Sequence, residues 1–228
     1  MMEMYNLAQL SLFANLNEEQ LNYLLSKTKL QNCTRGTILF REGQETNGTY
    51  IILSGLVKIF VLHKEGKEKT LAILKEGDIL GEMTLFNNPF RSATAEALDD
   101  SAYLHISNRD FIQLLADIPP LALNIIELLT ARLRHADQQI QELMFLNARS
   151  RIICNLVHLA AVHGVAEHDR IRIPLRLTHA ELANLVGVSR ETVTKVLDEL
   201  QKNHLIYIKN KQLWLLDTEE LYRQGTMD

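Results

Sequence analysis

The segment 178–202 constrains the fold of this chain more than any other, because it carries start and stop signals for two consecutive short helices. Residues 178–181, Thr-His-Ala-Glu, have the form of a capping box, in which the threonine hydroxyl and the glutamate side chain each bond a free backbone N–H at a helix start. Gly187 suits the left-handed residue that ends a helix, and Ser189 can cap the next one. The segment therefore predicts a helix-turn-helix.

The second of these helices has one apolar and one polar face. Its apolar residues recur at helical spacing and are expected to lie inward: Val193, Val196, Leu197 and Leu200. On the polar face, Arg190 can form a fork to guanine, Glu191 can accept a hydrogen bond from cytosine, and Lys195 can donate to guanine or phosphate. Thr178 can fix a phosphate at the start of the supporting helix. The pattern predicts binding of double-stranded DNA through Thr178, Ser189, Arg190, Glu191, Thr194 and Lys195. In the alternative interpretation these charges are only solvated.

The net charge of −4 at first argues against DNA as a partner. Its distribution matters more than its sum. Between Arg149 and Lys211 the chain has ten basic and six acidic residues, which leaves that segment at +4. A locally basic region can neutralise phosphates even in an acidic protein.

The expected cellular compartment follows from the lack of a membrane-spanning segment and of a secretory signal in the sequence. The chain has no run of the roughly 18 to 20 apolar residues that a membrane span needs, and its start, MMEMYNLAQLSLF, lacks the features of a secretory signal. We therefore expect a cytoplasmic protein without a membrane partner. Cys33 and Cys154 lie far apart and resemble neither a disulfide framework nor a metal site, so we expect buried free thiols.

The first half of the chain changes from helix to strand patterns. Residues 1–30 predict a short helix or two, one of them after the acidic start at 17–19. From 30 to 106, short β-rich runs alternate with glycines, and residues 64–67 and 75–78 read as turns. These runs predict an antiparallel sandwich or roll. A cupin-like enzyme is the alternative, but His63 and His105 are isolated, so we expect neither a metal site nor an enzyme.

A long helix is predicted from about residue 120 to residue 146. Apolar residues recur along it at alternating intervals of three and four: Ile126, Leu129, Leu133, Ala136, Ile140 and Leu143. This is a heptad seam, flanked by charged residues that include Arg132 and Asp137. It favours a two-fold interface between two copies of the chain, although a helix packed on its own domain would also show apolar periodicity.

The remaining residues, from about 147, predict a mainly helical domain. A β-hairpin is expected at 206–208 and 213–215, turning over 209–211. No long flexible linker separates this domain from the predicted seam helix, so motion of one can reach the other.

Residues 185–197, Leu-Val-Gly-Val-Ser-Arg-Glu-Thr-Val-Thr-Lys-Val-Leu, resemble the helix-turn-helix of the cyclic-AMP receptor (Crp/Fnr) family. The resemblance covers nearly the whole chain. It implies an α+β fold with a cyclic-nucleotide-binding β-roll (jelly roll) at 1–118, a dimerisation helix at 119–146 and a winged helix-turn-helix domain at 147–228.

The same resemblance implies a homodimeric transcription regulator with RNA polymerase as a further partner, touched near the predicted surface loop 163–170. Arg190 and Glu191 match the base-reading pair of the receptor branch, which implies a palindrome with half-sites similar to TGTGA. Lys195 stands where an arginine is usual, a departure that bears on the base read at that position.

The sharpest feature of the predicted roll is the pair of segments 77–83 and 87–93, which looks like the phosphate-binding cassette of cyclic-nucleotide sensors. Arg91 can hold a phosphate as a bidentate fork. Backbone N–H groups near Met83 and Ser92, with the serine hydroxyl, can hold other phosphate oxygens. Glu82 can accept from a ribose hydroxyl, and Gly81 permits close approach of the backbone. In the alternative interpretation, Glu82 and Arg91 form a structural ion pair.

Two departures from the family pattern leave the effector open, with cyclic AMP as the first candidate. The loop between Glu82 and Arg91 is about one residue shorter than in the enteric receptor. Ala136 and Asp137 stand where that receptor presents hydroxyls to adenine, and only Asp137 can accept from its amino group. Another nucleotide, a haem or gas, a metabolite or constitutive activity are the alternatives. The chain lacks the N-terminal cysteine set of the oxygen-sensing branch, and no motif supports a haem ligand among its histidines.

Overall fold

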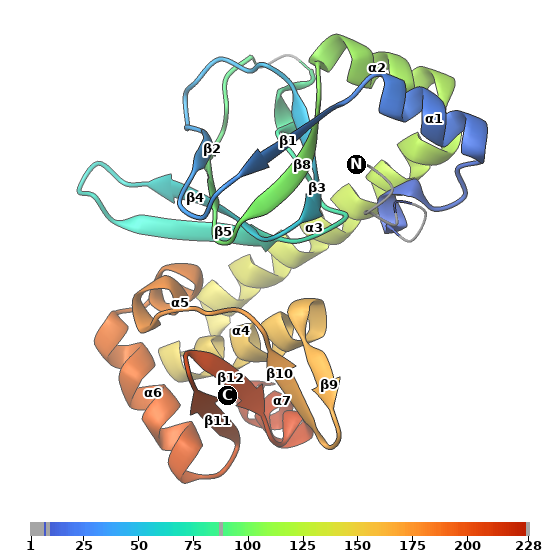
Figure 1. The fold of residues 1–228 in the computed structure, drawn as a ribbon. Helices are drawn as coiled ribbons and strands as arrows, with labels where there is room; N and C mark the ends of the chain where they lie inside the picture. Colours follow the sequence, from blue (N-terminus) through green and yellow to red (C-terminus); the bar gives the residue numbers. More distant parts are fainter. Residues whose placement is uncertain (1–6, 8–9, 87–88, 227–228) are drawn as a thin grey trace. The chain divides into compact units, whose positions relative to one another are not determined.

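The computed structural model describes residue 7, residues 10–86 and residues 89–226. It divides into two compact units, Met1–Arg134 and His135–Asp228. Strands dominate the first unit, and helices with one small sheet make up the second (Figure 1).

The first unit is built on two four-stranded sheets, ordered β1-β8-β3-β6 and β2-β7-β4-β5, and their described pairings are all antiparallel. Their strands are β1 (Lys29–Cys33), β2 (Ile38–Phe40), β3 (Thr49–Ser54), β4 (Val57–Leu62), β5 (Glu68–Leu74), β6 (Ile79–Leu80), β7 (Thr94–Ala97) and β8 (Ser101–Ile106). This arrangement confirms the predicted antiparallel roll.

Both predicted turns of the roll are confirmed. The turn at 64–67 joins β4 to β5, and Gly66 adopts a φ of 79° there. The turn at 75–78 closes with a hydrogen bond from the Asp78 N–H to the Lys75 carbonyl, at 3.0 Å, and Gly77 has a φ of 85°. Glycine reaches such left-handed backbone angles at little cost.

Strand β3 shows why the roll needs a cover of helices. Ile51 and Leu53 point into one apolar cluster, whereas Tyr50 and Ile52 point into another between the sheets. Helical residues complete the first cluster, among them Leu24, Phe111, Leu114, Leu121 and Ile125. The strand is therefore buried on both faces.

Those helices are η3 (Ser11–Phe13), α1 (Glu18–Ser26), α2 (Asn108–Asp117) and the first part of α3 (Pro119–Phe145). The short N-terminal helices were predicted. Helix α2 was not, although Ser107 caps it by accepting a hydrogen bond from the Asp110 N–H at 3.1 Å. None of the described helices alone has the length and apolar character that a membrane span needs. Helices α2 and α3 reach that length and apolar character only when they are taken together, and the two are bent by 111° relative to one another.

The second unit contains α4 (Ala148–His163), β9 (Val165–Glu167), β10 (Arg170–Ile173), α5 (His179–Val186), α6 (Arg190–Lys202), β11 (Ile206–Lys209), β12 (Gln212–Leu215) and α7 (Thr218–Thr226). Its sheet has the order β11-β12-β10-β9. The predicted hairpin is confirmed as β11 and β12, which turn through Asn210 and Lys211 in left-handed conformations.

The segment 163–170 lies at the surface, as predicted, but it is not a loop, because β9 and β10 form a hairpin there. The turn passes through His168 at a φ of 57°. Glu167 pairs with Arg172 and accepts a hydrogen bond from the Trp214 indole at 2.9 Å. Strand β10 does show the alternation of polar and apolar residues that is typical of a half-buried strand, whereas β9 is only three residues long and carries no such pattern.

Two histidine rings stack near the start of the second unit. The ring centroids of His135 on α3 and His158 on α4 lie 3.8 Å apart, with an angle of 9° between the planes. Burial lowers the pKa of both, and the added proximity of His135 and His163 lowers the pKa of His158 to about 4. The neutral ring is therefore the stable form of His158 in the folded protein.

We expect the free energy of unfolding to fall by roughly 1–2 kcal/mol between pH 7.5 and pH 5 through His158 alone. The unfolded chain binds a proton on this residue near pH 6.5, whereas the folded chain does so only near pH 4. Acid thus favours the unfolded state. The His158→Phe variant should lack this part of the pH dependence of the unfolding free energy, while it keeps an aromatic partner for His135. Urea unfolding at pH 7.5, 6 and 5 measures the effect. The exposed His204, changed to Asn, is the control; an unchanged slope in His158→Phe would contradict the assignment.

Candidate nucleic-acid interface and effector loop

Helix α5 starts and ends as its sequence predicts. Thr178 Oγ1 accepts from the Glu181 N–H at 3.2 Å, and the Thr178 N–H donates to Glu181 Oε2 at 2.6 Å. Gly187 ends the helix in the left-handed conformation, with φ 77° and ψ 45°. Both signals act between residues at most a few positions apart, so the turn to α6 is encoded locally.

Helix α6 presents a polar first turn and buries its other face. Ser189 accepts from the Thr192 N–H at 3.1 Å, which caps the helix. The residues predicted to lie inward are all buried: Val193, Val196, Leu197 and Leu200. Arg190, Glu191 and Lys195 are exposed. Hydrogen bonds from its own backbone N–H and from Ser189 hold the pKa of Glu191 below its usual range, so its carboxylate stays an acceptor.

Thr194 is less available than the helix pattern predicts. Its side chain is half-buried, and its hydroxyl donates to the Arg190 carbonyl at 3.0 Å. The hydroxyl also lies 2.8 Å from Nδ1 of His179 on α5. Thr194 thus links the two helices of the motif, a role that depends on how they pack.

Arg91 is the central residue of the predicted effector loop. Only 3% of it is exposed. Its Nη2 donates to the Gly48 carbonyl at 2.6 Å and to Asn47 Oδ1 at 3.1 Å, and its Nη1 donates to the Gly81 carbonyl at 3.2 Å. The guanidinium lies 4.1 Å from the centre of the Phe40 ring. The structure thus brings Arg91 into contact with Gly81, another residue of the predicted cassette.

Gly81 is required for that approach. It has a φ of 84°, and a Cβ built on it would overlap Nη1 of Arg91. Gly81 also precedes a single 3-10 turn, η4 (Glu82–Thr84). The glycine therefore sets both the turn and the space that the guanidinium occupies.

The alternative ion pair between Glu82 and Arg91 is not formed. Glu82 Oε1 instead pairs with Nη1 of Arg132 at 3.3 Å. Arg132, in the first-unit part of α3, also pairs with Asp78 at 3.3 Å and donates to the Ile79 carbonyl at 2.7 Å. Burial raises the pKa of Glu82, and the charge of Arg132 partly offsets this.

Sequence reasoning missed this role of Arg132. It placed the residue beside the heptad seam as a flanking charge, and its only signal was a long cation next to a seam position. The pairing joins residues fifty positions apart, so the local pattern does not contain it.

Arg91 itself remains a buried cation without a carboxylate partner. Among the described residues no acidic oxygen lies within ion-pair distance of it, and its buried Nε has no hydrogen-bond partner. Burial lowers the pKa of Arg91. A buried charge is costly unless it is paired, so an anion at this position would be stabilised.

The other residues of the loop are on the surface. Met83 is 68% exposed, and Ser92 is exposed with its hydroxyl 3.5 Å from the Met83 sulfur. Phe86 and Phe90 are also exposed. Asn87 and Asn88, part of the predicted cassette, lie outside the described residues.

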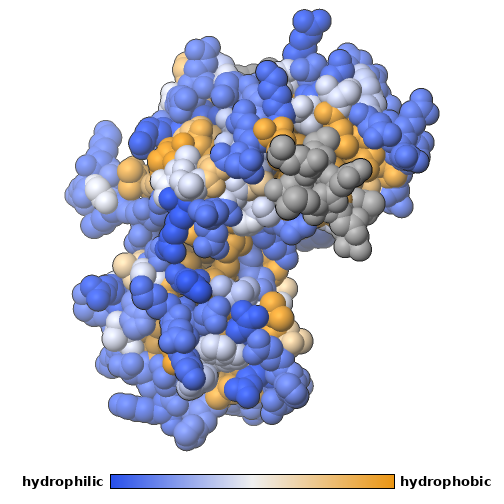
Figure 2. All heavy atoms as spheres, viewed as in Figure 1, coloured by the Kyte–Doolittle hydropathy of each residue, from blue (hydrophilic) through white to orange (hydrophobic). Residues whose placement is uncertain are grey.

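The predicted seam of α3 is an exposed apolar strip. Hydrophilic side chains cover most of the visible face of the molecule (Figure 2), whereas Leu133 is 63% exposed and Ile126 is 59% exposed. The other seam residues are exposed as well: Leu129, Ala136, Ile140 and Leu143. Asp137 beside them is exposed too. The described core of the chain does not cover this strip of the helix.

The two cysteines are free and half-buried. Burial raises the pKa of Cys33, and it raises the pKa of Cys154 to about 11. Among the described histidine, cysteine, aspartate and glutamate side chains, no group of three could hold a metal ion.

Comparisons with known proteins cover both units. Residues 30–117 match the family described as Cyclic nucleotide-binding domain, and residues 150–224 match the one described as Crp-like helix-turn-helix domain. The Cyclic AMP receptor protein of Thermus thermophilus is 35% identical over 86% of this chain and 87% of its own length. The CRP-like cAMP-activated global transcriptional regulator of Mycobacterium tuberculosis is 29% identical over 96% of this chain and 98% of its own.

A similar fold occurs in a solved structure, the c-di-GMP responsive global regulator CLP of Xanthomonas campestris. It has a TM-score of 0.77 at 26% identity and covers 89% of this chain and 100% of its own.

Proposed function

The chain belongs to the Crp/Fnr family of transcriptional regulators, and we propose that it is a homodimer whose binding to a palindromic DNA site is gated by an anionic effector, with cyclic AMP as the first candidate. Its parts in this proposal are a sensing domain at 1–118, a dimerisation helix at 119–146 and a winged helix-turn-helix domain at 147–228. RNA polymerase is a further proposed partner.

The observation that carries the effector proposal is the buried guanidinium of Arg91. It lacks a carboxylate partner among the described residues, and its Nε donor is unused. A cyclic phosphate would supply both a negative charge and an acceptor. Its proposed contacts are Gly81, Glu82, Met83, Arg91 and Ser92, joined by Ala136 and Asp137.

Arg132 offers a route from the effector to the dimerisation helix. Glu82 is the proposed acceptor for a ribose hydroxyl, and it already pairs with Arg132 on α3. A ligand hydroxyl must share Glu82 with that arginine. Effector binding would therefore alter the ion pair between Glu82 and Arg132 of α3. This change would shift the population of the protein toward the DNA-binding state.

Cyclic AMP is favoured by the names of two relatives, from Thermus and from Mycobacterium. The alternative is the same regulator with another effector, or with none. The Xanthomonas structure, described as responsive to c-di-GMP, supports that alternative. Ala136 also leaves an adenine with one contact fewer than the enteric receptor offers.

Binding to DNA is proposed through Thr178, Ser189, Arg190, Glu191, Thr194 and Lys195. The exposed first turns of α6 match the geometry of a recognition helix in the major groove. Two copies joined by the α3 seam would present two such helices about one DNA turn apart, ~34 Å, as a palindrome of TGTGA-like half-sites requires.

The experiment that tests the gated function is fluorescence anisotropy of a labelled duplex carrying that palindrome, titrated with the full chain. We expect cyclic AMP to tighten binding at least about fivefold, the lower range of allosteric coupling. A duplex with both half-sites scrambled is the control. Tight, sequence-specific binding that does not change with cyclic AMP would reject cyclic AMP as the effector and keep the DNA assignment. Equal binding to both duplexes would reject the DNA assignment.

We expect Arg190→Ala to weaken binding to the palindrome by roughly 5- to 150-fold, because a bidentate contact to guanine is lost. Arg190→Lys keeps the charge but loses the fork, so it should bind scrambled DNA as the native protein does and discriminate less. Anisotropy titrations on both duplexes measure this. Lys202→Ala, at the far end of α6, is the matched control. Equal losses on the two duplexes would assign Arg190 to phosphate contact only.

A further inference from the structure

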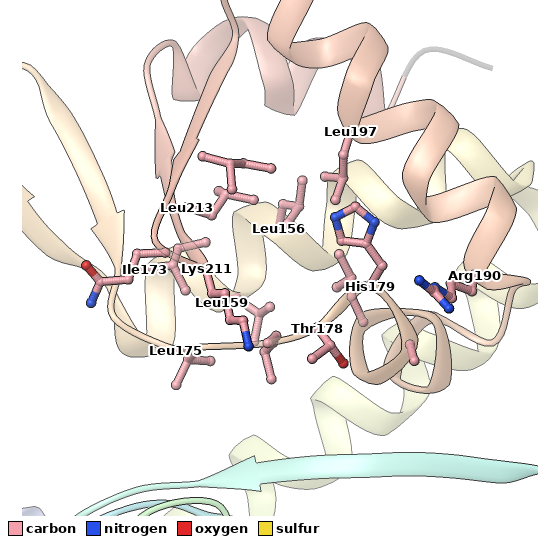
Figure 3. A pocket seen from close by; sticks show the side chains of 15 residues that line it. Leu156, Leu159, Ile173, Leu175, Thr178, His179, Arg190, Leu197, Lys211 and Leu213 are labelled. Carbon is pink, nitrogen blue, oxygen red and sulfur yellow. The ribbon is translucent and has the colours of Figure 1, made fainter.

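The second unit contains a cavity of about 610 Å³ that the proposed function does not use. Its lining comes from α4, β10, the start of α5, α6 and the hairpin β11–β12. Most of the side chains that face it are aliphatic, as Figure 3 shows for Leu156, Leu159, Ile173, Leu175, Leu197 and Leu213. Cavities of 300–1,000 Å³ with such linings commonly hold small molecules.

Two cations lie on this cavity. Lys211 and Arg190 both line it and are both exposed, and no described carboxylate forms an ion pair with either. Lys211 sits in the hairpin turn at a φ of 62°. In Figure 3 the end of its side chain lies toward Thr178 and the guanidinium of Arg190 toward His179. Apolar walls thus meet positive charge on one cavity.

We propose that this cavity binds an amphipathic anion, an aliphatic carboxylate, with its chain among the leucines and its head group on the side of the cations Lys211 and Arg190. The walls offer an alkyl chain favourable burial. A nucleotide would instead place a polar base among aliphatic side chains without partners. A neutral hydrocarbon would offer no negative charge to pair with the two cations.

Binding there would oppose the binding of DNA, a consequence that rests on the proposed function. Arg190 is the proposed guanine reader, and Thr178 is a proposed phosphate contact; both line the cavity. A carboxylate held by Arg190 removes that side chain from the groove. The effector loop in the first unit is not involved, so this site would act separately from cyclic AMP.

Calorimetric titration of the full chain with hexanoate, octanoate and decanoate tests the site directly, without DNA. We expect one site per chain and affinity that rises about fourfold for each added methylene. Decanol, which has the same chain without the charge, should bind roughly three- to tenfold more weakly than decanoate. No saturable heat with decanoate, or affinity that is independent of chain length, would overturn the proposal.

Three variants locate the site. Lys211→Gln should weaken the binding of decanoate roughly three- to tenfold and leave the binding of decanol unchanged. Ala180→Phe, at an exposed position that lines the cavity, should block both ligands while the unfolding transition stays that of the native protein. Lys202→Gln removes the same charge away from the cavity and should change nothing. Equal loss in Lys202→Gln and Lys211→Gln, or unchanged binding in Ala180→Phe, would place decanoate elsewhere.

A last titration tests the link to DNA. Saturating decanoate should weaken anisotropy binding to the palindrome at least about fivefold in the native protein, and it should have no effect in Ala180→Phe. Unchanged DNA affinity with decanoate bound would overturn the competition. Failure of the protein to bind DNA at all would reject the proposed function and leave the calorimetric result standing.

Discussion

Leu133→Glu is expected to make the protein monomeric and to lower its affinity for a palindromic duplex by roughly 10²–10⁴-fold. Leu133 is 63% exposed in the single chain and lies in the middle of the apolar strip on α3. In a two-fold interface the new carboxylate meets its own copy, and a buried unpaired charge costs several kcal/mol. The DNA affinity falls because each recognition helix then binds its half-site without help from the other.

Sedimentation measures the oligomeric state, and anisotropy on a full palindrome and on a single half-site measures the DNA affinity. The variant should bind the two duplexes almost equally. Ala131→Glu places the same charge on an exposed position of α3 outside the seam and should behave as the native protein does. A Leu133→Glu protein that stays dimeric would show that the exposed strip is not the interface.

Arg91→Ala is expected to weaken the binding of cyclic AMP by roughly 10²–10³-fold, because it removes the partner of a buried phosphate charge. The guanidinium is 3% exposed, and it meets the Gly48 and Gly81 carbonyls at hydrogen-bond distance. Loss of these bonds also loosens the loop. Arg91→Lys keeps a cation at the site without the fork, so it should retain part of the affinity.

Calorimetry with cyclic AMP and with adenosine separates phosphate binding from loop damage. Adenosine lacks the phosphate, so any loss of its weak binding in Arg91→Ala measures the loosening of the loop, and the additional loss seen with cyclic AMP measures the phosphate contact. Arg109→Ala, an exposed arginine on α2, is the control for the loss of a charge. A native protein that binds adenosine and cyclic AMP equally, or a variant that keeps its preference for cyclic AMP, would contradict the assignment of Arg91.

Much of the effector loop was predictable as a set of residues but not as a set of contacts. Gly81 and Arg91 both belong to the predicted cassette, but their mutual contact was not predicted. The partner of Glu82, however, is Arg132 and not Arg91. Each of these charges has several possible partners in the sequence, and the choice depends on which side chains are buried together.

The same distinction holds in the helix-turn-helix. The sequence by itself determined the capping box at Thr178, the left-handed Gly187 and the cap at Ser189, because each acts within four residues of chain. It also determined the heptad strip of α3, since periodicity alone decides which residues share a helix face.

Only the tertiary structure decided which polar groups are already engaged and which remain available. It commits Thr194 to His179, leaves Arg91 without a carboxylate partner in the described chain, and brings Lys211 from a hairpin to the cavity that Arg190 also lines. The reason is physical. Caps and helix faces depend on neighbours in sequence, whereas pairing and burial depend on the packing of distant segments, where the cost of an unpaired charge decides the contacts.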